Sequence, residues 1–264
     1  MEVKLLEKSK EKDKVSFILR DAAPAFANML RRYIIEEVPV MSIEDVEFRK
    51  NSSVLYDEMI AHRIGLVPLR TDLKSYTLPE KCKCEGKGCA RCTLKLVLKS
   101  KGPGVVYSSE IKSKDPKVKP VFQKIPIVKL LKGQLLEVEA IATLGKGKEH
   151  AKWNPGHVYY KYRPSIEIAS EPENSAELAA KYPQIFEIKN NKLLVVKENL
   201  LKYDLLDDFE GMTKGKVRVA EKDNEFIFLI ESFGQLDYIE MLTEALSAFE
   251  EHLEEFAEKL KKAS

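Results

Sequence analysis

The sequence has no long hydrophobic run and no strong excess of charge of either sign. No apolar stretch approaches the roughly 18 residues that a membrane-spanning helix needs. The segment Met1 to Lys8 lacks the apolar core of a secretory signal. We therefore expect a soluble, cytoplasmic chain without direct membrane contact. Its 44 basic and 42 acidic side chains leave a formal net charge of +2, which favours neither nucleic acid nor membrane as a direct partner.

Cysteine is absent except in one eleven-residue segment. All four cysteines lie there with the spacing Cys-x-Cys-x4-Cys-x2-Cys, at Cys82, Cys84, Cys89 and Cys92. Gly86 and Gly88 lie between them, where a chain that folds back on itself needs residues tolerant of positive φ. Flanking lysines and an arginine favour thiolate over thiol. The pattern predicts that four thiolates meet at one point and form a metal site.

The kind of site is open to three interpretations. Four thiolates without an additional ligand suit a closed, structural Zn²⁺ site, which we favour. An iron–sulfur cluster also takes four cysteines, but the Cys-x-Cys spacing and the lack of a following Cys-Pro fit ferredoxin runs poorly. Disulfides or free thiols are a third interpretation, because intracellular disulfides occur in hyperthermophiles.

Catalytic constellations are missing from the sequence. His62 lies between Glu58 and Arg63 without a neighbouring nucleophile or second histidine, so it is predicted to be a packed or hydrogen-bonded residue on a helix surface. The segment Gly145 to Trp153 has two glycines and three lysines but lacks the spacing of a phosphate-binding P-loop. We interpret it as an exposed contact loop anchored by Trp153. No catalytic or cofactor-binding residue is therefore assigned.

The N-terminal region predicts a strand followed by a helix. Val15 to Leu19 has strand character, Asp21 is a candidate N-cap, and Pro39 ends the helical pattern. Apolar residues between these points recur at helical spacing, at Phe26, Leu30, Tyr33, Ile34 and Val38. Arg31 and Arg32 are adjacent, and by themselves they fit either a solvated face or a contact surface.

The C-terminal region repeats this order with a much longer helix. Glu225 to Ser232 predicts a strand, and Gly234 separates it from the helix. Apolar residues then recur at alternating spacings of three and four, at Ile239, Leu242, Leu246, Phe249, Leu253, Phe256 and Leu260. Such a seam requires another helix alongside it. An internal helix would satisfy it, but the only other strong helix is shorter, so we favour a subunit interface.

Between the two ends, the chain predicts two further regions. Strand patterns occur within 94–99, 105–107, 135–143 and 158–162, which indicates a β-rich segment around the cysteine cluster. Residues 185–196 predict a hairpin with Asn190 and Asn191 at its turn. The stretch from Tyr203 to Glu210 is acidic and helix-like.

Two long motifs resemble a known family. The first runs from Phe26 to Pro39 and continues from Asn51 to Leu69 as NSSVLYDEMIAHRIGLVPL; the second is LGKGKEHAKW from Leu144 to Trp153. Together they resemble the D-type subunits of archaeal RNA polymerases, the counterparts of the bacterial α-subunit N-terminal domain and of the third-largest subunit of eukaryotic RNA polymerase II. The resemblance extends over essentially the whole chain.

The resemblance implies an assembly platform without catalytic residues of its own. The expected fold is α+β, with a dimerisation domain (1–40 and 218–264, a sheet plus two helices) split by a β-rich insert domain (41–165). A small ferredoxin-like module (166–217) follows. The helices would pair with the small subunit L, with subunits N and P beside them. Arg31 and Arg32 would face the large catalytic subunits, where guanidinium groups suit bidentate contacts. DNA would be reached only through the complex.

Two features qualify the resemblance. The cysteine loop matches the zinc loop of the eukaryotic counterpart, with one more residue between its second and third cysteines. Many archaeal relatives carry cysteine-ligated iron–sulfur clusters in the ferredoxin-like module, but this chain has no cysteine between 166 and 217, so we expect no cluster. A stand-alone zinc-containing nucleic-acid-binding protein is the alternative function; an iron–sulfur redox protein would show iron and colour.

Overall fold

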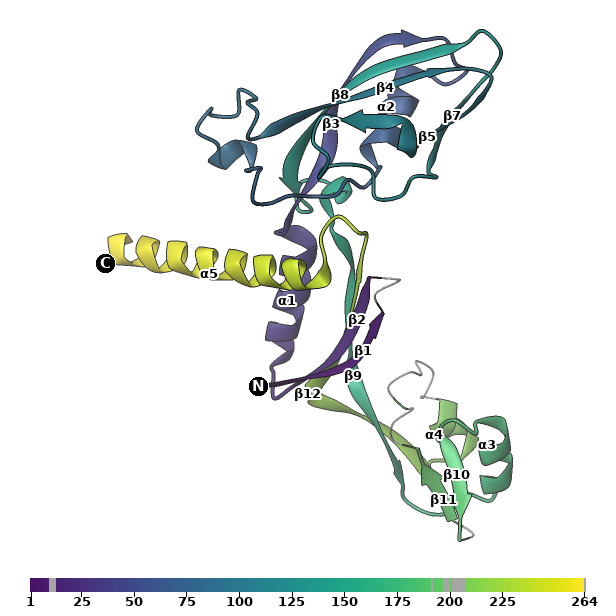
Figure 1. Cartoon of the computed structure of the whole chain (residues 1–264). Helices are drawn as coiled ribbons and strands as arrows, with labels where there is room; N and C mark the ends of the chain where they lie inside the picture. Colours follow the sequence, from purple (N-terminus) through teal and green to yellow (C-terminus); the bar gives the residue numbers. More distant parts are fainter. Residues whose placement is uncertain (10–12, 191, 197–199, 201–207, 264) are drawn as a thin grey trace. The chain divides into compact units, whose positions relative to one another are not determined.

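The computed structural model describes residues 1–9, 13–190, 192–196, 200 and 208–263. The chain forms two compact units, each assembled from three segments. Their helices and strands are labelled in Figure 1. The first unit contains Met1–Glu7, Ser16–Asn28 and Tyr159–Leu229, and the second contains Lys8–Val15, Met29–Val158 and Ile230–Ser264. Mixed helices and antiparallel strands confirm the predicted α+β class. The domain boundaries drawn from the sequence stay a prediction.

One four-stranded sheet joins the two ends of the sequence. Its order is β1 (Glu2–Ser9), β2 (Lys14–Arg20), β12 (Val217–Ser232) and β9 (Gly156–Ile168). Within the first unit, Phe17 stacks on Phe228 with ring centroids 5.3 Å apart. The pattern of the sequence did not indicate β1. Most of its side chains are exposed on both faces, so its sequence has no alternation of buried and exposed positions.

The first unit also contains the small module. It consists of α3 (Ser175–Lys181), the hairpin β10 (Phe186–Lys189) and β11 (Lys192–Val195), and α4 (Asp208–Met212). Buried residues hold them together, namely Ile166, Leu178, Ile185, Phe186, Leu193, Leu200, Phe209 and Val217. The predicted hairpin is confirmed, with Lys189 opposite Lys192; Asn191 lies outside the described residues. Residues 203–207 of the predicted acidic helix also lie outside them.

The second unit contains another four-stranded antiparallel sheet. Its order is β3 (Pro39–Asn51), β8 (Leu135–Lys146), β4 (Thr93–Lys101) and β6 (Ile111–Ser113). A second pair, β5 (Gly104–Tyr107) and β7 (Pro126–Leu130), and helix α2 (Asp57–Gly65) complete this part. Strand β4 alternates in the predicted way, with Leu94, Leu96 and Leu98 buried in the core. Short 3₁₀ helices are η1 (Pro79–Lys81), η2 (Ser108–Glu110) and η3 (Ala151–Trp153).

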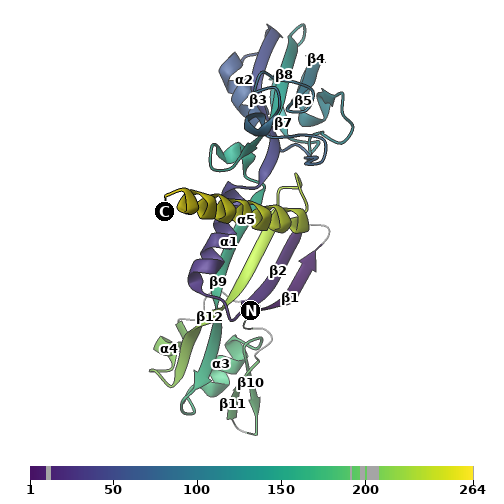
Figure 2. The same ribbon diagram turned by 90° about the vertical axis from the view of Figure 1, so that its left-hand side faces the viewer.

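Two α-helices complete the scaffold, α1 (Pro24–Glu36) and α5 (Tyr238–Ala263). Figure 2, a view turned by 90° from Figure 1, shows that α5 crosses α1. The N-cap prediction for Asp21 is wrong. Asp21 has a φ of 51° and accepts a hydrogen bond from Asn224, while the carbonyl of Ala23 accepts the first bonds of α1. Among the described residues, no helix is both long and apolar enough to cross a membrane.

The segment from Gly145 to Trp153, at the end of β8 and just after it, contacts the end of α1. Trp153 is buried and packs directly over Gly145. A Cβ on Gly147 would stand 2.0 Å from the carbonyl oxygen of Ile35, so only glycine fits there. The Nζ of Lys146 donates to buried Glu37 at 2.8 Å. Lys146 therefore serves an internal contact and buried Trp153 anchors the segment as predicted, while residues 148–151 between them are exposed.

Candidate metal centre and subunit-contact helix

The four cysteines converge as predicted. Their Sγ atoms all lie within 4.8 Å of one another, and the separations for four pairs are 3.4 to 3.8 Å. With metal–sulfur bonds near 2.3 Å, the edge of a tetrahedron of thiolates is roughly 3.8 Å. All four residues are free cysteines. The sulfurs are therefore spaced to bind one metal ion.

Local backbone geometry produces this convergence. Glu85, Gly86 and Gly88 all adopt positive φ, at 54°, 76° and 83°. These left-handed positions turn the chain back between the second and third cysteines. The backbone N–H of Cys89 donates to Sγ of Cys92 at 3.3 Å, an interaction that stabilises a thiolate. The loop is closed at its base by the N–H of Thr77, which donates to the carbonyl of Arg91 at 2.9 Å.

The thiols differ in their acidity. Hydrogen bonds from the backbone and then from the thiol of Cys84 lower the pKa of Cys82 to about 6. Burial raises the pKa of Cys92 to about 12. A metal ion that binds these four thiols has to displace their protons. Its positive charge would then compensate the charge of the buried Cys92 thiolate. Among the described residues, these cysteines are the only group of three or more metal-ligating side chains close enough to share an ion.

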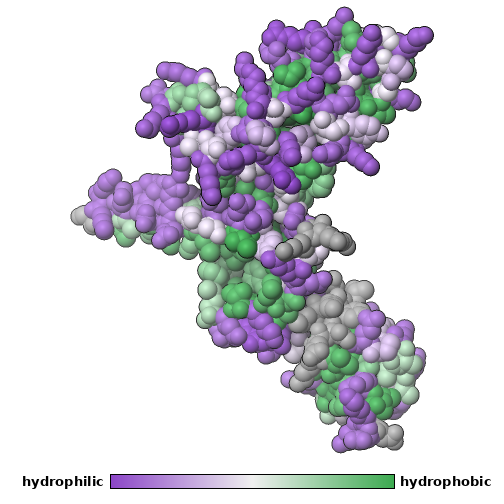
Figure 3. All heavy atoms as spheres, viewed as in Figure 1, coloured by the Kyte–Doolittle hydropathy of each residue, from purple (hydrophilic) through white to green (hydrophobic). Residues whose placement is uncertain are grey.

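The α5 helix buries one face and exposes a neighbouring apolar stripe. Met241 and Ala245 are buried, and Leu242 and Phe249 are half-buried. In contrast, Ile239, Leu246, Leu253 and Phe256 are exposed by 57, 46, 50 and 65%, and we call these four residues the exposed stripe. Figure 3 shows hydrophobic residues along the lower edge of α5 beneath a hydrophilic upper face. The predicted seam is therefore divided between internal packing and solvent.

Tyr33 of α1 makes the central contact between the two helices. Its ring meets Phe249 edge-on at 5.3 Å, and its hydroxyl lies 3.0 Å from Nδ1 of His252. Burial raises the pKa of Tyr33, so the phenol stays protonated. Leu30 is buried, and half-buried Phe26 belongs to the part of α1 in the first unit. After His252, every described residue of α5 is exposed.

The paired arginines of α1 differ in their surroundings. Arg32 is exposed, and its Nε and Nη2 donate to both carboxylate oxygens of Glu36 at 3.1 and 2.9 Å. These hydrogen bonds from Arg32 lower the pKa of Glu36. Arg31 is half-buried. One residue of the pair is therefore already in a bidentate pair within its own helix.

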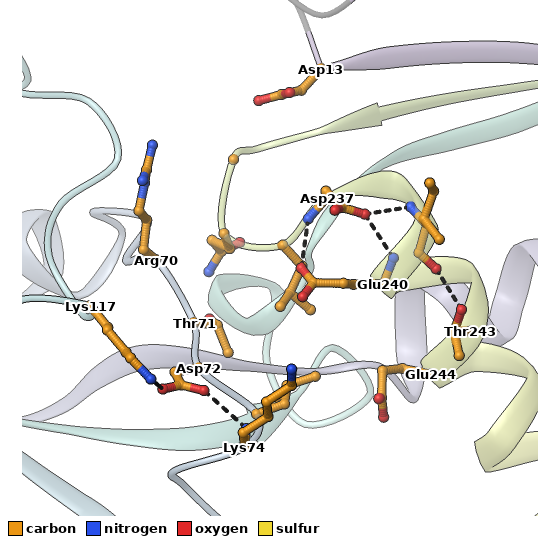
Figure 4. Close-up of a pocket in the computed structure, with 15 residues that line it drawn as sticks. Asp13, Arg70, Thr71, Asp72, Lys74, Lys117, Asp237, Glu240, Thr243 and Glu244 are labelled. Carbon is orange, nitrogen blue, oxygen red and sulfur yellow. Dashed lines mark hydrogen bonds and ion pairs between the residues drawn. The ribbon is translucent and has the colours of Figure 1, made fainter.

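A groove of about 870 Å³ opens beside the first turns of α5 (Figure 4). Its carboxylates serve the fold. Asp72 accepts from Nζ of Lys117 at 2.7 Å, and this bond, together with one from Ser75, lowers the pKa of Asp72 to about 2. Asp237 caps α5 through the N–H groups of Ile239 and Glu240 at 2.7 and 2.8 Å. Because Ile239 also lines the groove, the groove is continuous with the exposed stripe.

His62 lies on the surface of α2, as the sequence predicts, but its side chain is exposed rather than packed. It borders a shallow pocket of about 300 Å³ with His150 and Lys152. Lys152 forms an ion pair with Glu44 and donates to the carbonyl of Ile43 at 3.1 Å. These contacts position the loop after β8, so the pocket is part of the junction between loop and sheet.

Sequence reasoning missed two sets of contacts. The inner face of α5 is formed by Met241 and Ala245, which are buried. Their spacing of four residues is a weaker sequence signal than the longer apolar repeat of the same helix. Lys81, directly before the first cysteine, forms an ion pair with Glu251 of α5. No local signal links these two residues, which lie 170 positions apart.

Comparison with known proteins places these features in one family. Residues 43–158 match the sequence model described as the RNA polymerase Rpb3/RpoA insert domain. The chain is 37% identical over 265 residues to DNA-directed RNA polymerase subunit Rpo3 of Pyrococcus horikoshii, covering 99% of this chain and 98% of that protein. It is 37% identical to Rpo3 of Methanosphaera stadtmanae, covering 92 and 93%, and 35% identical to Rpo3 of Archaeoglobus fulgidus, covering 96 and 96%. The chain therefore belongs to the archaeal family of DNA-directed RNA polymerase subunit Rpo3, the family its motifs resemble.

Proposed function

We propose that this polymerase subunit is the assembly platform of its complex and pairs with the small subunit L through α5. The observation that carries the proposal is the exposed stripe, Ile239, Leu246, Leu253 and Phe256. Four large apolar side chains along one helix are costly to leave in water, and a partner helix would bury them. The groove beside Ile239 extends this surface at the start of α5.

The other partners follow from the same platform. Subunits N and P are proposed to bind beside the heterodimer, and the large catalytic subunits to bind through α1. Arg31 and Arg32 are the candidate contacts for the large subunits. Arg32 would either release Glu36 and bind a carboxylate of the large subunit, or contact that subunit while still paired with Glu36.

We further propose that Cys82, Cys84, Cys89 and Cys92 hold one Zn²⁺ with a structural role. The spacing of their sulfurs supports a single tetrahedral ion. An iron–sulfur cluster would place its thiolates on different iron atoms and so hold them wider apart. The ion would fix a loop that has little core of its own, because only Cys82 and Cys92 are buried between positions 81 and 92.

Co-expression with an L-type subunit tests the proposal. We expect a soluble 1:1 heterodimer, and we expect Leu246→Glu with Leu253→Glu to abolish it, because each places a charge inside the buried contact. Ser247→Glu is the matched control, since Ser247 is exposed on the polar face of the same helix. Phe249→Glu is less informative, because Phe249 also packs on Tyr33 within the chain. A heterodimer that survives the double stripe variant would refute the proposed interface.

A further inference from the structure

The outer half of α5 has few internal supports. From Glu250 to Ala263 only His252 is half-buried, and the other described side chains are exposed. Its contact with α1 is made by Tyr33, through Phe249 and His252. Beyond that point the helix extends past α1 (Figure 1). Leu253 and Phe256 of the exposed stripe lie on this outer half, so their position depends on what holds it.

The cysteine loop reaches the same part of α5. Lys81 ends η1 and is bonded directly to Cys82, and its Nζ forms an ion pair with Oε1 of Glu251. The hydrogen bond and charge of Lys81 lower the pKa of Glu251, and Lys146 adds a smaller effect. Glu251 and His252 are adjacent. The same turn of α5 therefore contacts Tyr33 through His252 and Lys81 through Glu251.

We propose that the cysteine loop positions the outer half of α5 through the Lys81–Glu251 ion pair, so that metal binding to the four cysteines strengthens binding of the partner on the exposed stripe. This inference rests on the proposed function of α5. A metal ion held by Cys82, Cys84, Cys89 and Cys92 would cross-link the loop and so restrict the backbone next to Lys81. A restricted Lys81 loses less side-chain and backbone freedom when it pairs with Glu251.

The expected effect is modest. Both side chains are about half exposed, and exposed ion pairs are weak because water screens them. Loss of the pair should weaken partner binding by about two- to five-fold. Such a change is measurable, and it is far smaller than the loss expected from a charge within the exposed stripe.

Charge exchange at the pair provides the first test. The dissociation constant of the zinc-loaded full chain for the L-type subunit would be measured for wild type and Lys81→Glu. We expect about two- to five-fold weaker binding for Lys81→Glu, recovery when Glu251→Lys is added, and near-wild-type binding for Lys81→Arg. Lys95→Glu is the matched control, because Lys95 is exposed on β4 and lies outside the cysteine loop. Equal losses from Lys81→Glu and Lys95→Glu, or no recovery in the exchanged variant, would overturn the proposal.

Hydrogen exchange provides a test that does not need the partner. We expect backbone amides of residues 250–263 to exchange faster after Zn²⁺ is removed with a chelator, and Lys81→Ala to reduce this response. Unchanged exchange in wild type would overturn the inference even if the stripe variants abolish the heterodimer. Conversely, a heterodimer that tolerates the stripe variants would refute the proposed function, while the exchange experiment would still decide whether the loop positions α5.

Discussion

Truncation of Leu253 tests the exposed stripe with little risk to the fold. Leu253 is half exposed and lies on the part of α5 beyond the contact with Tyr33. Complete burial of a leucine side chain contributes about 1.5–3 kcal/mol, so docking the exposed half contributes about 1 kcal/mol. We therefore expect Leu253→Ala to weaken binding of the L-type subunit about five-fold.

The assay is isothermal titration of the purified chain with the partner, paired with thermal unfolding of the chain alone. Unfolding should change by less than about 0.5 kcal/mol, as for most exposed positions. Ser247→Ala on the polar face is the control and should leave the affinity unchanged. An unchanged affinity in Leu253→Ala would refute the interface. A large loss of stability in the free chain would instead show that Leu253 is packed internally.

Three further predictions address the scaffold and the other partners. Gly147→Ala should lower the stability to urea far more than Gly65→Ala, because the added Cβ would stand 2.0 Å from a carbonyl oxygen at 147 but 3.7 Å at 65; similar losses would contradict the junction. The pKa of Asp72 is about 2 in the folded chain and about 3.9 when unfolded, so its stabilisation is complete above about pH 5 and is lost as the pH falls toward 2. In denaturation curves over that range, Asp72→Asn should flatten the pH dependence by on the order of 1 kcal/mol, and an unaltered slope would count against the ion pair with Lys117. Replacing Arg31 and Arg32 by alanine should spare the heterodimer but reduce recovery of the large subunits in affinity purification; full recovery would exclude them as contacts.

Local patterns predicted the elements whose signal lies within one segment. The helical spacing of Leu30, Tyr33 and Ile34 identified α1, and the cysteine spacing identified the convergent thiols. Alternation identified β4, whereas β1 has exposed residues on both faces and therefore gave no signal. The physical reason is that periodicity reports which side chains avoid water, and β1 buries few of them.

Contacts between distant segments could not be predicted in the same way. The heptad of α5 showed that Phe249 and Leu253 share a face, but only the position of Tyr33 decides that Phe249 is covered and Leu253 is not. The role of Gly147 likewise depends on the carbonyl of Ile35, a residue far earlier in the chain. The apolar repeat of α5 and the glycines after β8 are visible in the sequence, but the residues that they contact are not.

Native mass spectrometry of the purified chain, with and without an L-type subunit, tests both the pairing and the metal site when the bound metal is identified in the same measurement. We expect a 1:1 heterodimer that carries one Zn²⁺ on this chain. Persistence of the chain as a separate species in the presence of excess partner would contradict it.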